Sequence, residues 1–178
     1  MNKEVFRSIN IGLSISAVFL VICISIGFFN TPFQKGDAVR LSGDLLKERE
    51  YVDTMTASIQ KFTKTSLEIK DASDQANDGK IVPQTLAQIY ARDFDAVQNE
   101  YNRIQTMKDV PQRFKTFHTT YLNAMEYQGM VMNETMEYIK DKEPTRMENV
   151  DKYNKGFVSE YNNAVSMFNR LLEEGKVR

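Results

Sequence analysis

Histidine is the side chain with which chemistry near neutral pH would begin, and the chain has a single one, His118. Nucleophilic catalysis would need a Ser or Cys beside this base, but the lone Cys23 lies in an apolar run and no Gly-x-Ser-x-Gly motif occurs. A di-iron bundle would carry Glu three residues before the His, where Lys115 stands. We therefore expect no catalytic residue and no enzymatic activity, with His118 partly buried or at the rim of a core.

Methionine forms the one unusual cluster of possible ligands. Met125, Met130, Met132 and Met136 fall within one predicted helix, and His118, Met125 and Met132 recur at intervals of seven, on one face. Thioethers with an imidazole could bind Cu(I). Methionine also fills irregular gaps in helical cores, which is the favoured interpretation. We accordingly expect no metal and no cofactor.

The tyrosines divide into those at or near core spacing and those outside it. Tyrosines outside the core spacing could form a contact surface, because they carry a large area at low entropic cost. Tyr127 and Tyr138 are the candidate partner-contact residues, since they are eleven apart and so share one helix face over about 16 Å. The alternative is that both rings pack at the edge of the core.

Long helices must position these side chains, because only 4 Pro and 8 Gly interrupt the chain. Apolar residues at alternating spacings of three and four predict helices over about 37–77, 83–108, 111–142 and from 145 onward. The first follows a heptad seam of the coiled-coil type. Short connections make successive helices antiparallel. The expected fold is all-α: an antiparallel up-down-up-down four-helix bundle with an extended first helix, after an N-terminal transmembrane helix.

The transmembrane helix is predicted from residues 9–29, a run of 21 residues without a charge. A helix of that length rises about 32 Å, enough to cross a hydrocarbon core of about 30 Å. The alternative is a cleaved signal peptide, whose apolar core is usually about 7–15 residues long. Bulky Ile22 before Cys23 argues against a lipidated Cys. The length of the run favours a retained anchor.

These predictions divide the chain into four parts. Residues 1–8 form a cytoplasmic tail, 9–29 the anchor, 30–50 a juxtamembrane linker and helical stalk, and 51–178 an extracytoplasmic four-helix bundle. Basic residues flank both ends of the anchor, but Lys3 and Arg7 are dense within the short tail. No Cys follows the anchor, which suits an oxidising exterior. We expect a single-pass protein of the cell membrane with its amino terminus in the cytoplasm.

Composition and layout together favour binding over catalysis. The 23 basic and 24 acidic residues give a net charge of −1, which argues against nucleic acid as a partner. We expect a membrane-anchored extracytoplasmic module that acts through protein or cell-envelope contacts. The layout resembles, in architecture and without a shared motif, the ligand-binding half of bacterial chemoreceptors and sensor kinases. That resemblance implies the alternative, a ligand-sensing bundle, which without a second apolar span would work with a separate signalling partner.

Overall fold

Four long helices make up most of residues 43–176, the part of the chain that the computed structural model describes. They are α3 (Gly43–Asn77), α4 (Pro83–Gln105), α5 (Lys115–Asp141) and α6 (Pro144–Lys176), with a short 3-10 helix, η2 (Gln112–Phe114), before α5. The described residues contain no strand, so the predicted all-α class is confirmed for them. The predicted transmembrane helix, residues 9–29, lies outside this part. Within the part described, no helix is both long and apolar enough to span a bilayer.

Local sequence features coincide with the ends of these helices. Gly79 follows α3 with a φ of 73°, the left-handed conformation that glycine adopts at little cost. Pro83 opens α4, a position where the missing N–H is harmless. Helix α4 ends at Gln105, earlier than predicted. The Thr106 hydroxyl donates to the carbonyl oxygens of Asn102 and Arg103 in the last turn.

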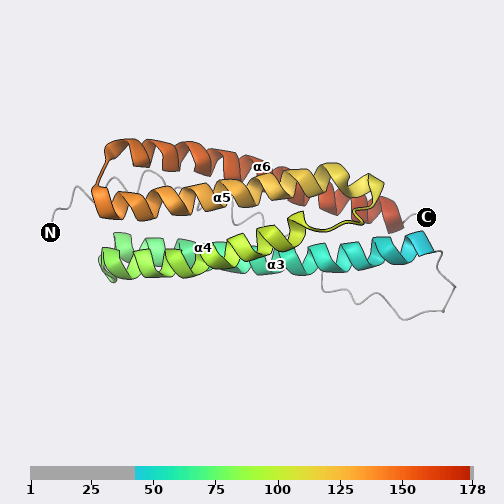
Figure 1. Cartoon of the computed structure of the whole chain (residues 1–178), viewed down its shortest axis with the longest axis horizontal. Helices are drawn as coiled ribbons and strands as arrows, with labels where there is room; N and C mark the ends of the chain where they lie inside the picture. The colour runs from blue at the N-terminus through green and yellow to red at the C-terminus, as the bar shows by residue number, and fades with distance from the viewer. Residues whose placement is uncertain (1–42, 177–178) are drawn as a thin grey trace.

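Successive helices are antiparallel neighbours, as predicted (Figure 1). The start of α3 and the end of α6 lie at one end of the bundle, and the α3–α4 and α5–α6 connections lie at the other (Figure 1). The most extensive packing is between α5 and α6, and α4 lies against both α3 and α5. The structure is therefore an up-down-up-down bundle over the described residues.

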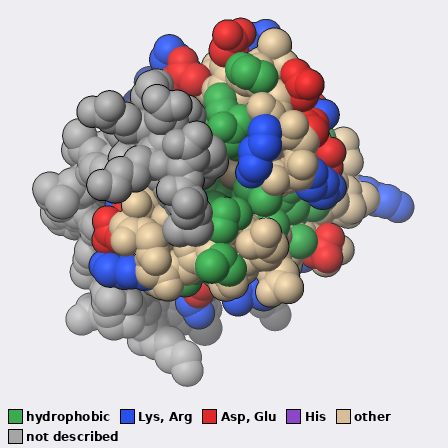
Figure 2. Space-filling model, turned by 90° about the vertical axis from the view of Figure 1, so that its left-hand side faces the viewer, with side chains coloured by type: hydrophobic (Ala, Val, Ile, Leu, Met, Phe, Trp, Pro, Cys, Tyr) green, Lys and Arg blue, Asp and Glu red, His purple; other side chains and the backbone are tan. Residues whose placement is uncertain are grey.

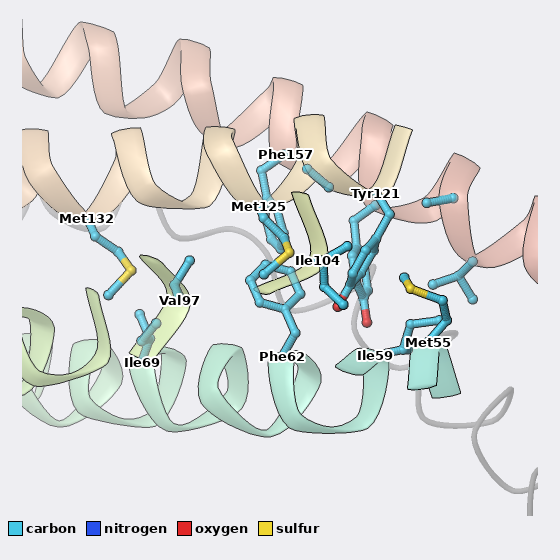
Figure 3. Packing of buried hydrophobic residues seen from close by; sticks show 14 of the residues in the cluster. Met55, Ile59, Phe62, Ile69, Val97, Ile104, Tyr121, Met125, Met132 and Phe157 are labelled. Atoms are coloured by element: carbon cyan, nitrogen blue, oxygen red, sulfur yellow. The ribbon is translucent and has the colours of Figure 1, made fainter. Parts of the chain in front are cut away.

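Aromatic rings fill the middle of the core, and Phe62 of α3 lies at their centre (Figure 3). Its ring meets Tyr121 of α5 and Phe157 of α6 nearly edge-on, with centroids 5.9 and 6.0 Å apart. The Tyr161 ring lies 5.6 Å away on the same helix as Phe157. Edge-to-face pairs of this kind stabilise a core beyond their buried area. The apolar seams predicted for these helices do face inward, since Ile59 and Phe157 are both buried.

The described part of the predicted stalk, residues 43–50, belongs to the first turns of α3. The Glu48 carboxylate pairs there with the Arg113 guanidinium, which also donates to the Leu171 carbonyl oxygen of α6 at 3.2 Å. Leu45 and Leu46, by contrast, are about half exposed, at 52 and 49%. Arg113 thus links Glu48 of α3 to the end of α6, while the domain boundary at residue 50 stays a prediction.

Two alanine substitutions on α3 test which face of this helix is buried. Ile59→Ala removes a buried side chain, so we expect it to lower the free energy of unfolding by about 2–5 kcal/mol. Leu67→Ala is the control, because Leu67 is 38% exposed and its truncation should cost less than about 1 kcal/mol. Urea unfolding followed by circular dichroism measures both. Equal costs at the two positions would contradict the observed packing of α3.

Candidate functional site

Hydroxyl groups on the buried face of α3 bond to a tyrosine on each of the other three helices. We call these three pairs the tyrosine bonds: Ser73 with Tyr90 of α4 at 2.8 Å, Ser58 with Tyr121 of α5 at 3.1 Å, and Thr63 with Tyr161 of α6 at 2.6 Å. Ser73 and Thr63 donate their own protons to backbone carbonyls one turn earlier, so the tyrosines donate to them. A buried tyrosine hydroxyl without such a partner would cost about 1–3 kcal/mol.

Glu100 of α4 places a carboxylate beside this set, with its side chain only 5% exposed. Burial alone would raise its pKa, but hydrogen bonds from Arg103, Ser58 and Lys61 outweigh burial and hold the pKa of Glu100 at about 2. Lys61 reaches it from α3 with its Nζ 3.1 Å from Oε2. Because the group is fully ionised at neutral pH and already paired, it is suited to holding α3 against α4 and not to proton transfer.

His118 is buried and bonded in the same manner. Its Nδ1 lies 3.0 Å from the Tyr51 hydroxyl of α3, and the two rings are 5.9 Å apart. Burial lowers the pKa of His118, so the ring is neutral at pH 7. Tyr51 is buried as well and packs against Phe114. It stands seven residues before Ser58 and so shares the buried face of this helix.

The predicted contact tyrosines lie at the junction of α5 and α6. The Tyr127 ring packs over Gly156, where an added Cβ would come within 2.8 Å of it, and lies 6.5 Å from the Tyr153 ring. Tyr138 is 7% exposed, with the Lys142 ammonium 5.3 Å from its ring centroid. Most of each ring is covered, which agrees with the alternative that both rings pack at the edge of the core. A role for them in partner contact stays a prediction.

The methionines that suggested a copper site pack in two places. Met125 and Met132 are fully buried in the core, where their side chains point between the helices (Figure 3). Met130 instead lies at the edge of a groove. No group of three or more His, Cys, Asp or Glu side chains suited to a metal occurs within residues 43–176. The core contacts explain Met125 and Met132 without a ligand.

A groove lies beside Met130 on the described surface. It has a volume of about 400 Å3 and lies between α4 and α5, with one contribution from α6. The space beside Gly129 is open, since a Cβ at this position would meet only the Phe94 ring, at 3.7 Å. Its lining combines aromatic, thioether and carboxylate groups: Phe94, Tyr101, Met125, Glu126, Met130, Glu134 and Tyr153. The volume lies within the range of small-molecule pockets, which is about 300–1,000 Å3.

Glu100→Gln tests whether the buried carboxylate supports the fold as its pKa indicates. A carboxyl group with a folded pKa of about 2 and an ordinary value of 4.5 contributes its full stability above pH 4.5 and loses it as the pH falls toward 2. We expect the free energy of unfolding of the wild type to fall over this range by up to about 3 kcal/mol more than that of E100Q. Chemical unfolding at several pH values measures the difference.

The matched control is Glu126→Gln, which removes an exposed carboxylate from α5. Its pH dependence should follow the wild type. Parallel curves for the wild type and E100Q would show that Glu100 contributes nothing specific.

Comparison with known proteins identified no relative of this chain. No protein-family model, no curated protein and no solved structure matches the chain. Its function must therefore be inferred from the groups and surfaces described above.

Proposed function

We propose that the chain is a non-enzymatic binding module, tethered to the membrane by residues 9–29 with its bundle outside the cytoplasm, that acts through contact with a protein or another envelope component. The interior supports a binding role over a catalytic one. Among the described residues, the buried titratable groups of the kind that catalysis uses are His118, Glu100 and Asp93. His118 and Glu100 are held in hydrogen bonds within the core, and Asp93 accepts a hydrogen bond from Arg92 Nε at 2.6 Å. Such groups stabilise the fold, so we assign the function to the surface.

The single observation that carries the proposal is an apolar patch at the end of the bundle that holds the helix connections. Figure 2 shows hydrophobic side chains gathering on this end, among Lys, Arg, Asp and Glu side chains. Val82, in the α3–α4 connection, is 52% exposed, and Ile81 beside it is partly buried. An apolar patch with a charged rim is typical of a protein-interaction surface. We call this end the tip.

The position of the tip suits a tethered protein. The first residue of α3 lies at the opposite end of the bundle (Figure 1). With 35 residues, α3 is about 52 Å long, so it would hold the tip far from an anchor that precedes it. A tether also confines the module to a surface where envelope partners are confined, which raises their effective concentration.

Val82→Asp tests the tip without weakening the fold. Val82 is the N-cap residue of α4 and makes no side-chain capping bond. Asp is among the preferred residues there, so the variant should be at least as stable as the wild type while it places a charge in the patch. We expect affinity capture with the full-length, detergent-extracted protein to recover a partner with the wild type and to lose at least about nine-tenths of it with V82D, since a desolvated charge opposes docking.

The matched control is Leu67→Glu, which adds the same charge at an exposed apolar residue on the side of α3, away from the tip. It should capture the partner as the wild type does. Capture that survives in V82D, or that is lost equally in both variants at unchanged melting temperature, would contradict the proposed role of the tip.

A second candidate function is ligand sensing in concert with a separate signalling partner. The observation that favours it is the α4–α5 groove, whose volume is large enough for a small molecule but too small for a protein partner. The tip and the groove are separate features, so the two functions can be tested independently.

A further inference from the structure

We infer that the α4–α5 groove binds a small organic amine, with its ammonium group near Glu126 and its apolar body against Phe94, Tyr101 and Met130. This inference rests on the second candidate function, ligand sensing, and specifies the chemical class of the ligand. It is carried by the charges, rings and shape of the lining.

The charges of the lining are all negative. Glu126 and Glu134 contribute carboxylates, and among the lining residues that the structure describes there is no Lys or Arg. Arg146 already pairs with Glu134 at 3.2 Å. Glu126 is exposed and takes part in none of the ion pairs formed by the described residues. Glu126 is therefore a carboxylate of the lining without an ion-pair partner among the described residues, and such a carboxylate attracts a cation and repels an anion.

The rings of the lining suit the same class of ligand. Phe94 and Tyr101 contribute aromatic rings from α4, and Tyr153 contributes one from α6. Aromatic faces attract cations electrostatically as well as apolar groups by burial. The structure shows this preference at one of them, since the Lys152 ammonium lies 5.7 Å from the Tyr153 ring centroid.

The shape of the groove limits the size of the ligand. The volume of about 400 Å3 admits a molecule of one or two rings. Gly129 gives it access to the floor, where Met125 is part of the core. A Cβ added at Gly129 would make only an ordinary contact with the Phe94 ring, at 3.7 Å, so a side chain longer than that of alanine would be needed to fill the groove.

Three probes with one apolar body and different charges test the inference: 4-phenylbutylamine, 4-phenylbutan-1-ol and 4-phenylbutyrate. The full-length protein in lipid nanodiscs is labelled with 13C at the methionine methyl groups. Met125 and Met130 line the groove and report on binding, while Met55, buried on α3 and outside the lining, is the internal control. We expect the amine to shift the Met130 signal at a concentration about fivefold lower than the alcohol, with the carboxylate weaker still.

Two variants locate the binding. Glu126→Gln keeps the shape and removes the charge, so the amine should bind no better than the alcohol. Gly129→Leu fills the groove and should abolish the shifts, while Gly129→Ala, whose added Cβ makes an ordinary contact, should retain them. Equal binding of amine and alcohol by the wild type, an amine response unchanged in E126Q, or no shift with any probe would each overturn the inference. None of these outcomes alters the test of the tip, which uses a different surface and a different readout.

Discussion

The tyrosine bonds of α3 are the constraint on which the rest of the bundle depends. Apolar seams pack without direction, so heptad-spaced helices can slide or rotate past one another at modest cost. A buried hydroxyl pair is formed in only one arrangement, and leaving it unformed is costly. Because Ser73, Ser58 and Thr63 each reach a tyrosine on a different helix, α3 fixes the position of all three partners.

The shape of the α4–α5 groove depends on this register of the helices. The pair of Ser73 with Tyr90 and the pair of Lys61 with Glu100 align α3 with α4 at two separate levels. With α5 held to α3 through Tyr121, the ring of Phe94 comes opposite Gly129. A shift of α4 or α5 by one turn would set a full side chain opposite that ring and close the groove. The polar interior thus determines the shape of the groove.

The helices could be predicted from the sequence because their signals are local. Pro83 and Pro144 mark the starts of helices, the three-and-four spacing indicates the buried face, and Gly79 indicates the turn after α3. Ile59 and Phe157 are buried as that spacing predicts.

The groove and the polar core depend on which residues meet across helices, and a single sequence does not contain that register. In the sequence, nothing distinguishes Glu100 from a surface charge. In the structure, Lys61 from another helix donates a hydrogen bond to it. Gly129 and Gly156 are both glycines inside helices, but one borders an open groove and the other makes room for the Tyr127 ring. The identity of the facing residue decides between these roles, so spacing alone could not.

A double-mutant cycle at Thr63 and Tyr161 measures the central claim most directly, since this pair joins the first and last helices of the bundle. Thr63→Val and Tyr161→Phe each remove one hydroxyl and keep the shape of the side chain. If the tyrosine bonds set the register, the two changes are coupled, and the double variant is less destabilised than the sum of the singles by about 1 kcal/mol or more. Additive losses, within about 0.3 kcal/mol, would show that the hydroxyls meet by coincidence and that apolar packing alone positions α3.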